Sequence, residues 1–334
     1  MHKVSVLALG NWGTALANHL ARKGCDVLGW SIQEEVVSSI NEHNRHPIFL
    51  KTEQLSKNLV ATSNLELALK REILVMAFPS SVMAEVVPKM KLKDGSLVIS
   101  AIKGLDPSSL KTPIEYCEEH LPTKARLAVL SGPSFARDVV AGKPCGIVAA
   151  SKESADAEEV AKLFYDEAMK VYFTEDTKGV ELGGILKNVI ALAVGICDGL
   201  QLGDSARAGL VTRGLAEITR LACALGANER TLFGLSGLGD LVMTATCDTS
   251  RNRTVGLRLG RGEKLDHIIE TLGSTAEGVK TAPIVVKLAE KVGVDVPISN
   301  RVVSILNSEI SIEEAMRTLM QRPIKREFSS PEHE

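Results

Sequence analysis

The sequence predicts an α/β amino-terminal half, a Rossmann-type doubly wound sheet, followed by an all-α carboxyl-terminal half. The chain has 334 residues, which at roughly 100–200 residues per domain suggests two domains. Short apolar runs alternate with helical patterns up to about residue 176, and only helical periodicities follow. Strands that alternate with helices form right-handed crossovers and a largely parallel sheet covered on both faces.

The amino-terminal half holds seven clear strand candidates and a weaker one at 59–61. Helical patterns separate several of them, as a doubly wound sheet requires. Strands are expected at 4–9, 26–30, 73–77, 96–101, 127–130, 146–150 and 170–174, and helices at 13–22, 34–42, 65–70 and 155–165.

The carboxyl-terminal half shows long helical periodicities and no convincing strand. The pattern changes near residues 175–178, so we expect a dinucleotide-binding domain at 1–176 and a helical substrate-binding domain at 177–334. Helices are expected at 180–198, 206–225, 281–292, 298–306 and 312–320.

Composition excludes several classes of protein. The chain is 45% hydrophobic and 24% charged, as in ordinary globular domains. Its formal net charge is -2 and its pI is about 6.4, whereas a nucleic-acid partner normally leaves a basic patch or a high pI. Aromatic residues are only 4%, which argues against a base-stacking surface. We therefore expect no nucleic-acid partner.

Cysteine usage and apolar runs predict a cytoplasmic protein. Six scattered cysteines lack any Cys-x-x-Cys spacing, which favours reduced core thiols over disulfides or a metal site. The chain enters its first strand at residue 4, without the pattern of a secretory signal. The longest apolar stretch, 185–197, is interrupted by Lys187 and Asn188. We interpret it as a buried helix and expect no membrane insertion.

The first strand runs into a glycine turn that resembles the dinucleotide fingerprint G-x-G-x-x-G. Gly10 and Gly13 stand at its second and third glycine positions, and Ala8 replaces the first. Gly10 lets the backbone approach a pyrophosphate, and the following helix offers free N–H groups to it. The alternative is a tight strand–helix turn without a ligand. Neither an acid nor an arginine stands at the end of the second strand, so NAD and NADP both remain open.

Two further loops follow strands directly, where ligands bind in open α/β sheets. Lys103 lies in the first, and its alternative interpretation is a solvated loop lysine. Gly132 and Ser134 lie in the second, where Ser134 could instead be a helix N-cap.

Lys187 is the most informative residue. On a 3.6-residue period it shares one face with Gly184, Asn188, Ala191 and Gly195, and that face is small and polar while the others are apolar. Burial would lower the pKa of this lysine and let it exchange a proton near neutral pH. The alternative is a lysine that extends along its stem to the surface.

Two further groups complete the candidate site. Asp240 ends a glycine-rich loop and could hold Lys187 as a counter-charge, cap a helix, or do both. The segment 250–253, Ser-Arg-Asn-Arg, is a compact donor cluster that suits a phosphate. An exposed basic turn is the equal alternative.

Together these segments resemble the bacterial NAD(P)-dependent glycerol-3-phosphate dehydrogenases over residues 4–320. Six motifs in order carry the resemblance, and they are far more specific than any one alone. They are Gly10–Ala17, Ser131–Ala136, Leu186–Val189, Gly237–Leu241, Ser250–Arg253 and Ala276–Gly278. Two departures stand out: Ala8 replaces the usual first glycine, and the family's frequent basic residue after strand two is missing.

The resemblance implies a hydride transfer between NAD(P)H and a small phosphorylated substrate, interconverting dihydroxyacetone phosphate and sn-glycerol 3-phosphate for phospholipid synthesis. It implies Lys187 as the proton-transferring lysine, assisted by Lys103 and Asp240. Cofactor contacts are implied for Gly10, Asn11, Trp12, Gly13, Lys103, Ala136, Arg251 and Glu277. Substrate contacts are implied for Lys103, Gly132, Ser134, Lys187, Asn188, Asp240, Ser250, Arg251 and Asn252.

Two other functions compete with this one. A ketopantoate or 3-hydroxyacid dehydrogenase would share the two-domain plan but bind a carboxylate in place of a phosphate. A nucleotide-sensing module would bind NAD(P)H without turnover and would need no buried lysine. We expect no metal, since no His/Cys cluster has ligand spacing. A homodimer is compatible with the sequence, which carries no signal for oligomeric state.

Overall fold

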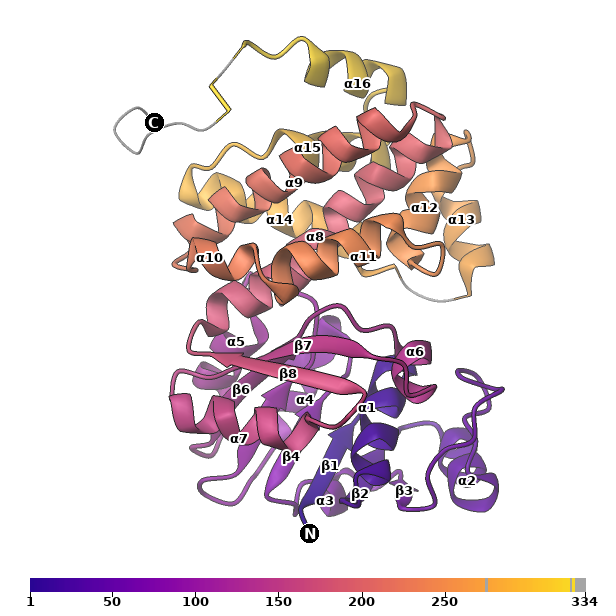
Figure 1. The fold of residues 1–334 in the computed structure, drawn as a ribbon, viewed down its shortest axis with the longest axis vertical. Helices are drawn as coiled ribbons and strands as arrows, with labels where there is room; N and C mark the ends of the chain where they lie inside the picture. Colours follow the sequence, from indigo (N-terminus) through magenta and orange to yellow (C-terminus); the bar gives the residue numbers. More distant parts are fainter. Residues whose placement is uncertain (274–275, 325, 328–334) are drawn as a thin grey trace.

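The computed structural model describes residues 1–273, 276–324, 326 and 327 and has a sheet-containing half below a helical half (Figure 1). The sheet has eight strands in the order β3-β2-β1-β4-β5-β6-β7-β8. The first six strands follow the doubly wound order. The chain builds outward from β1 to β3 on one side, then crosses back to add β4, β5 and β6 on the other side. The strands are β1 Lys3–Leu7, β2 Asp26–Trp30, β3 Leu59–Thr62, β4 Ile73–Met76, β5 Leu97–Ser100, β6 Arg126–Ser131, β7 Cys145–Ala150 and β8 Met169–Thr174.

The sheet is parallel except where β7 runs antiparallel to β6, with Ser131 opposite Val148. One antiparallel pair is compatible with the largely parallel sheet that the alternating pattern predicts, although the sequence did not indicate its position. Residues 132–144 join the two strands and contain only a five-residue helix, whereas a parallel crossover usually runs through a longer helix. The chain returns antiparallel to β6, and β8 then pairs with β7 in parallel.

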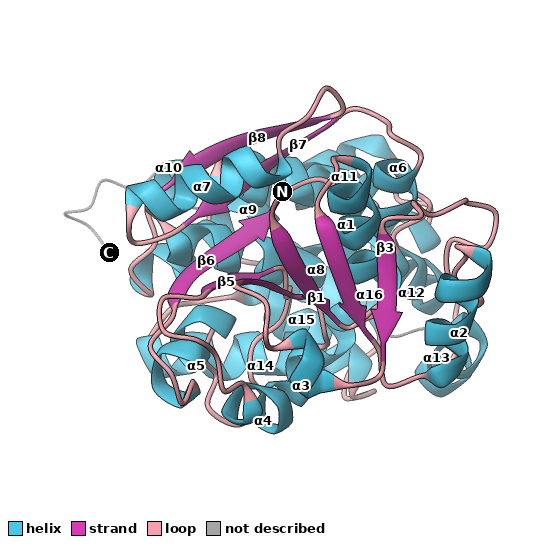
Figure 2. Ribbon diagram, turned by 90° about the horizontal axis from the view of Figure 1, so that it is seen from below, coloured by secondary structure: helices cyan, strands magenta, loops and turns pink. Residues whose placement is uncertain are grey.

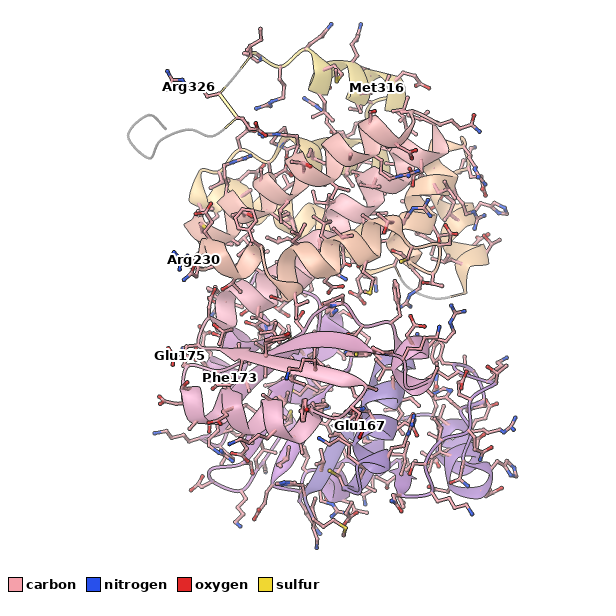
Figure 3. The ribbon with its side chains drawn as sticks, in the orientation of Figure 1. Glu167, Phe173, Glu175, Arg230, Met316 and Arg326 are labelled. Carbon is pink, nitrogen blue, oxygen red and sulfur yellow. The ribbon has the colours of Figure 1, made fainter. Side chains whose placement is uncertain are left out.

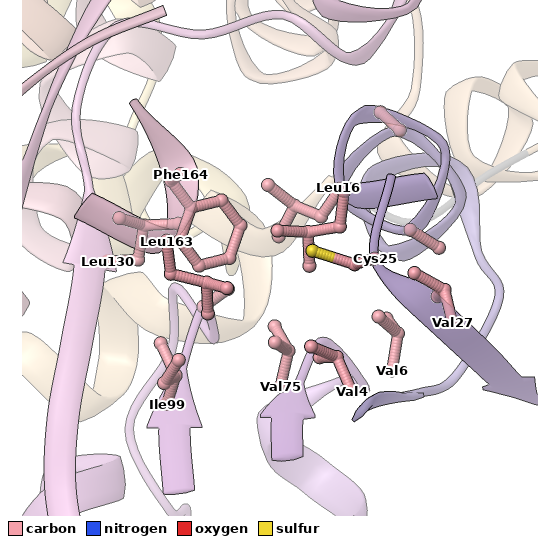
Figure 4. Close-up of a cluster of buried hydrophobic side chains, with 14 of the residues drawn as sticks. Val4, Val6, Leu16, Cys25, Val27, Val75, Ile99, Leu130, Leu163 and Phe164 are labelled. Carbon is pink, nitrogen blue, oxygen red and sulfur yellow. The ribbon is translucent and has the colours of Figure 1, made fainter. Parts of the chain in front are cut away.

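Apolar side chains on both faces hold the sheet between helices. Val4 and Val6 of β1 pack toward Leu16 of α1 and, farther along the sheet, Phe164 of α7 (Figure 4). Leu7 lies in a separate cluster on the opposite face. Strands buried on both faces are nearly continuously apolar, which explains why the sequence showed runs here and little alternation.

The helices of this half cover both faces, as the view from below shows (Figure 2). Their bounds are α1 Asn11–Arg22, α2 Glu34–His43, α3 Leu65–Ala68, α4 Met83–Val86, α5 Pro113–His120, α6 Ala136–Val140 and α7 Ser154–Phe164. Sequence reasoning did not predict α4 or α5, and it reached α6 only through the alternative interpretation of Ser134 as a helix N-cap. Segments this short show little helical periodicity. A local signal for α5 existed: Thr112 and Glu115 form a capping box in front of Pro113.

The helical half begins at α8, two residues after β8 ends. Its helices are α8 Thr177–Gly199, α9 Asp204–Ala224, α10 Glu229–Leu232, α11 Asp240–Thr246, α12 Arg251–Gly260, α13 Leu265–Leu272, α14 Glu277–Val292, α15 Pro297–Leu306 and α16 Ile312–Met320, with a π-helical turn at Leu235–Gly239. No strand occurs in the described part of this half, as the sequence predicts. The helices α10 to α13 and the π-turn were not foreseen.

Helix α8 is the central element of this half. It is long and apolar enough to cross a membrane by length and composition, yet its residues are buried inside the protein, so it is a core helix. Helix α12 lies against it with almost no side chains between: a Cβ at Gly195 would stand 2.2 Å from the carbonyl oxygen of Arg253, and one at Gly256 would stand 2.1 Å from that of Leu192. This close approach brings the start of α12 beside the middle of α8.

The glycine turn after β1 carries a strained residue that can be tested. Ala8 has a φ of 79°, a left-handed conformation that costs an L-residue about 1–2 kcal/mol. Glycine would adopt this conformation without the steric cost. Its unfolded chain has more conformational freedom, however, and this offsets about 0.5–1 kcal/mol of the stabilisation. We expect Ala8→Gly to raise the free energy of unfolding by about 0.5–1 kcal/mol, measured by urea denaturation.

The matched control is Ala15→Gly, in the buried middle of α1. There the same substitution removes a methyl group from ordinary helical backbone and should lower the free energy of unfolding by about 1 kcal/mol or more. An Ala8→Gly variant less stable than the parent would show that the turn does not store strain at this residue.

Candidate active site

The loops after β1, β4, β5 and β6 meet at one edge of the sheet, directly beneath the helical half (Figure 1). Parallel strands place their carboxyl ends on the same edge, where ligands of open α/β sheets bind. All the predicted site residues of the amino-terminal half lie in these loops or in the helices that start from them.

The glycine turn ends in an uncapped helix. Gly10 is the N-cap of α1 without a side-chain cap, and the first turn contains no acid. A Cβ at Gly10 would meet nothing within 4 Å, whereas one at Gly13 would stand 1.9 Å from the carbonyl oxygen of Ala8. Free N–H groups and the positive end of the helix dipole favour an anion there. The turn therefore fits the pyrophosphate of a dinucleotide.

Two neighbours of this turn agree with such a ligand. The indole nitrogen of Trp12, which follows Asn11 in the first turn of α1, is buried and has no hydrogen-bond partner among the described residues. Buried donors are normally paired, so a missing ligand is one physical explanation. Ala136 is buried at the start of α6, a helix that packs against α1.

The end of β2 does not select between NAD and NADP. After Trp30, the hydroxyl of Ser31 accepts a hydrogen bond from the backbone N–H of Gln33. Glu34 begins α2, where an acid is favourable in any helix.

Lys187, Lys103 and Asp240 form one charged cluster. The Nζ of Lys187 donates to Asp240 Oδ1 at 2.5 Å and to Thr244 Oγ1 at 2.6 Å. The Nζ of Lys103 donates to the second carboxylate oxygen, Asp240 Oδ2, at 2.6 Å and to the backbone carbonyl of Gly132 at 3.2 Å. One carboxylate thus fixes two ammonium groups that lie on different halves of the protein.

Burial sets the electrostatics of the cluster. The side chain of Asp240 is 0% exposed, that of Lys187 5% and that of Lys103 21%. Loss of hydration lowers the pKa of Lys187 to about 8; the Asp240 charge opposes this shift and the Lys103 charge reinforces it. Desolvation alone would raise the pKa of Asp240, but the two lysines together hold it below its ordinary value. The carboxylate therefore stays ionised, and Lys187 can exchange a proton near neutral pH.

Glycines on the polar face of α8 leave space for Lys103 and for the turn that leads to Asp240. A Cβ at Gly184 would stand 2.5 Å from Ser131 Oγ and 3.9 Å from Lys103 Cδ, so the stem of Lys103 crosses α8 at this glycine. A Cβ at Gly183 would stand 2.8 Å from the carbonyl oxygen of Ser236 in the π-turn. The turn leads directly into α11, whose first residue is Asp240. Glycines at both positions thus let the cluster close.

The loop that carries Lys103 is anchored on the helical half. Leu105 packs with Ile185 of α8 and Leu288 of α14 in a small buried cluster. Just beyond it, Asp106 Oδ2 accepts hydrogen bonds from the backbone N–H groups of Ser108 and Ser109, at 3.2 and 2.8 Å, and from both hydroxyls. This folded loop holds Lys103 against the cluster although its side chain is partly hydrated.

The remaining predicted residues gather where α8, α12 and α14 meet. Asn252 Nδ2 donates to Asn188 Oδ1 at 2.9 Å, and the N–H of Gly278 donates to Asn252 Oδ1 at 2.8 Å. Glu277 precedes Gly278 and reaches the Lys103 loop, since its Oε2 lies 3.5 Å from a Cβ built at Gly104. Partial burial raises the pKa of Glu277 against the opposing charges of Lys280 and Arg251.

The donor cluster at 250–253 is the start of a helix and not an exposed turn. Ser250 caps α12 by accepting from the N–H of Arg253 at 3.3 Å. Arg251 projects to solvent at the first position of α12. Arg253 is an ion-pair partner of Asp198 and Asp248, both at 2.7 Å, so it is not available to a ligand. Within this segment, only the guanidinium of Arg251 remains available to a ligand.

Two capping interpretations are corrected by the structure. Ser134 is not an N-cap: Phe135 holds that position in α6, and the Ser134 hydroxyl donates to the carbonyl of Gly132 at 3.1 Å. Asp240 is the first helical residue of α11 and Gly239 is the N-cap, because the π-turn continues without a break into the helix.

Sequence reasoning missed Thr244 and Ser131. Thr244 lies one turn after Asp240 on α11, and the spacing i, i+4 would have identified it once α11 was recognised. The hydroxyl of Ser131 is buried without a partner among the described residues, at the end of β6 and against Gly184. No local sequence signal distinguishes this serine from an ordinary strand residue.

Comparison with known proteins assigns the family. The amino-terminal family model of NAD-dependent glycerol-3-phosphate dehydrogenase matches residues 3–157, and the carboxyl-terminal model matches residues 176–317. The chain is 44% identical to glycerol-3-phosphate dehydrogenase [NAD(P)+] of Geobacter metallireducens, covering 97% of this chain and 98% of that protein. It is 43% identical to the same enzyme of Lysinibacillus sphaericus, over 100% of both chains.

Solved structures agree. The crystal structure of glycerol-3-phosphate dehydrogenase from Coxiella burnetii superposes with a TM-score of 0.92 at 35% identity, covering 96% of this chain and 99% of that one. A ketopantoate reductase from Ralstonia eutropha, covering 94% and 99%, reaches only 0.59 at 15% identity and shares the fold alone.

The fold and these matches define an oxidoreductase that uses a nicotinamide dinucleotide. The chain belongs to the NAD-dependent glycerol-3-phosphate dehydrogenase family, and the two family models together span most of its length.

A second buried titratable group on α8 gives the junction of the two halves a pH dependence. Glu181 is 3% exposed and its Oε1 accepts a hydrogen bond at 2.9 Å from the N–H of Ile114, near the start of α5. Burial raises the pKa of Glu181 to about 8 from an ordinary value of 4.5. The folded protein therefore keeps this proton up to about pH 8, whereas the unfolded chain releases it near its ordinary value.

This difference predicts that stability falls between about pH 5 and pH 8, because the unfolded chain ionises first. Glu181→Gln cannot ionise and still accepts from Ile114. We therefore expect the difference in melting temperature, variant minus parent, to be larger at about pH 8.5 than at about pH 5.5, measured by calorimetry. Glu66→Gln, on the exposed face of α3, is the control. Equal offsets at both pH values for Glu181→Gln would contradict a buried neutral carboxyl.

Proposed function

We propose that this protein catalyses the NAD(P)-dependent interconversion of dihydroxyacetone phosphate and sn-glycerol 3-phosphate. The observation that carries the proposal is the buried ammonium of Lys187, fixed by Asp240 and Thr244 in the helical half, above the sheet edge that carries the glycine turn. Family membership supports the same reaction through the names of the relatives.

The dinucleotide would lie along the carboxyl edge of the sheet. Gly10, Asn11, Trp12 and Gly13 would hold its pyrophosphate at the uncapped start of α1, with Ala136 beside them. Lys103, from the loop after β5, would lie at its nicotinamide end together with Arg251 and Glu277 from the helical half. When bound, the dinucleotide supplies or accepts the hydride of the reaction.

Lys187 then acts as the acid for ketone reduction. As the substrate carbon is reduced, negative charge grows on the ketone oxygen, and a nearby ammonium stabilises that charge and gives it a proton. The reverse oxidation uses the neutral amine as base. A pKa of about 8 lets the same group serve both directions near neutral pH, while Lys103 adds a second positive charge and Asp240 holds both lysines in place.

The phosphate of the substrate would bind at the start of α12. Arg251 supplies a guanidinium that forms no ion pair among the described residues, and Asn252 lies beside Asn188. Gly132 and Ser134 would line the pocket from the β6 loop, and the Ser250 hydroxyl, which caps α12, would keep the donors in position.

Four broader statements belong to the same proposal. We propose a dinucleotide-binding domain at 1–176 and a substrate-binding domain at 177–334, divided between β8 and α8. The protein would work in the cytoplasm, without membrane insertion, and supply glycerol phosphate to phospholipid synthesis. It would do so as a homodimer.

The two competing functions fit the site less well. A hydroxyacid or ketopantoate reductase would place a carboxylate where Arg251 and the α12 start offer phosphate donors, and its structural relatives share only the fold. A sensor without turnover would gain nothing from burying Lys187, since removing an ammonium from water costs several kcal/mol.

Lys187→Ala tests the proposed acid. Removing the ammonium should lower kcat for dihydroxyacetone phosphate reduction by about 10²–10⁴-fold, while the affinity for the dinucleotide is nearly unchanged. Turnover is followed by absorbance of the reduced nicotinamide, with NADH and NADPH in parallel. The control Lys162→Ala removes an exposed lysine of α7 and should retain full activity. Near-normal turnover in Lys187→Ala would exclude this lysine as the proton donor.

Arg251→Ala tests the phosphate subsite. Loss of one charge-assisted contact should raise KM for dihydroxyacetone phosphate by about 10–100-fold, the equivalent of roughly 1.5–3 kcal/mol, with a smaller change in kcat. Dihydroxyacetone without the phosphate is the comparison substrate, and its slow turnover should change little. Equal effects on both ketones would show that Arg251 does not bind the phosphate.

A further inference from the structure

A buried histidine outside the charged cluster contacts the glycine turn. His46 lies three residues after the end of α2 and is 1% exposed. Its Nε2 lies 2.8 Å from the backbone carbonyl oxygen of Leu9, the residue between Ala8 and Gly10 of the turn. The segment that carries His46 extends from α2 toward the helical half (Figure 1; side chains in Figure 3), so it reaches the edge of the sheet where the turn lies.

The hydrogen bonds of His46 define its tautomer. The backbone N–H groups of Ile48 and Phe49 both donate to its Nδ1, at 3.1 and 3.0 Å, so this nitrogen carries no proton. In a neutral imidazole the proton then belongs to Nε2, which donates to the carbonyl of Leu9. Burial lowers the pKa of His46, against the opposing effects of this hydrogen bond and the charge of Glu35. The ring is therefore neutral near pH 7.

The contact with His46 fixes a peptide group of the glycine turn. The carbonyl of one residue and the N–H of the next point in opposite directions across a planar trans peptide, so holding the Leu9 oxygen also sets the direction of the Gly10 N–H. That N–H has no hydrogen-bond partner among the described residues, and a Cβ at Gly10 would meet nothing within 4 Å. On its other side Leu9 is held by β2, because its N–H donates to the carbonyl oxygen of Trp30 at 3.1 Å. The turn is thus supported from β2 and from His46.

The segment that carries this histidine is itself anchored. The N–H of Ser56 donates to Asn18 Oδ1 of α1 at 2.7 Å, and the N–H of Leu55 donates to the carbonyl of Asn44 at 2.8 Å, which closes the segment into a loop. Leu50 within the loop has a φ of 54°, a left-handed conformation that such a residue keeps only where surrounding contacts hold it. A loop held in this way is a fixed support for the imidazole.

We infer that His46 is a positioning residue for the bound dinucleotide, because it holds the peptide between Leu9 and Gly10 in the orientation that the pyrophosphate requires. The histidine acts through the backbone of the turn and takes no part in the reaction itself. A histidine that only stabilised the fold would change the melting temperature when replaced, whereas a positioning residue also sets the affinity for the dinucleotide. The inference rests on the proposed role of the glycine turn in holding the pyrophosphate.

Two substitutions separate the two hydrogen-bonding nitrogens of the ring. In His46→Asn the side-chain oxygen takes the place of Nδ1 and accepts from the loop, as in an Asx turn, but the side chain is too short to donate to Leu9. In His46→Gln the longer side chain brings its amide N–H groups near the position of Nε2, but the loop loses its acceptor.

The dissociation constant of NADH, measured by isothermal titration calorimetry on the full-length protein, is the main readout. We expect it to rise about tenfold in His46→Asn and to stay within about twofold of the parent in His46→Gln. His43→Asn, at the exposed end of α2, is the control and should bind NADH as the parent does. Circular dichroism and the melting temperature of each variant show that it folds.

A second measurement uses the parent alone. Nitrogen NMR of the His46 ring near neutral pH should show a neutral imidazole with its proton on Nε2. The Nε2 signal should shift when NADH is added, because the ligand and the histidine share the turn. A proton on Nδ1, a charged ring, or an Nε2 signal that does not respond to NADH would overturn the inference.

The outcomes separate this inference from the proposed function. An affinity for NADH that falls equally in His46→Asn and His46→Gln, in step with their melting temperatures, would show a structural role only and overturn the inference. An unchanged affinity in His46→Asn would also overturn it, while binding of NADH by the parent leaves the proposed function standing. A parent that does not bind NADH overturns the proposed role of the glycine turn and this inference together.

Discussion

One buried carboxylate holds the two halves of the candidate active site together. Asp240 accepts from Lys187 through one oxygen and from Lys103 through the other, and its side chain is fully buried. Without it, two ammonium groups would face each other in a poorly hydrated site, where like charges disfavour ionisation and closure. The carboxylate therefore couples the position of the Rossmann-like domain to that of the helical domain, and the local packing is arranged around this contact.

The backbone around the cluster of Asp240, Lys187 and Lys103 departs from regular structure at several points. Glycines on α8 allow the Ser131 side chain, the π-turn and α12 to approach within distances that a Cβ would prevent. The π-turn is a departure from regular helix that often accompanies functional sites, and here it sets the direction in which α11 presents Asp240 and Thr244. Leu105 and the folded loop at Asp106 supply the corresponding rigidity for Lys103.

The sequence predicted what local patterns encode. The first strand and glycine turn, the change of pattern near residue 176 and the buried polar face of α8 follow from periodicity and residue type within short windows. It could not predict the antiparallel return of β7, which depends on how the strands pair in the sheet, or α12, whose start was interpreted as a cluster of donors. The pairing of Asn188 with Asn252 joins residues 64 positions apart, and the ion pairs that remove Arg253 from the site join α12 to the end of α8. Such contacts depend on packing that no short window contains.

The two lysines share a counter-ion and still differ in their surroundings. Lys103 keeps about a fifth of its side chain in contact with solvent, whereas Lys187 keeps almost none. Hydration stabilises an ammonium, so burial lowers the pKa of Lys187 to about 8. The neighbouring charge of Lys103 adds to this effect. A single aspartate can therefore position both groups, and the proposed mechanism gives the proton transfer to the buried lysine for this reason.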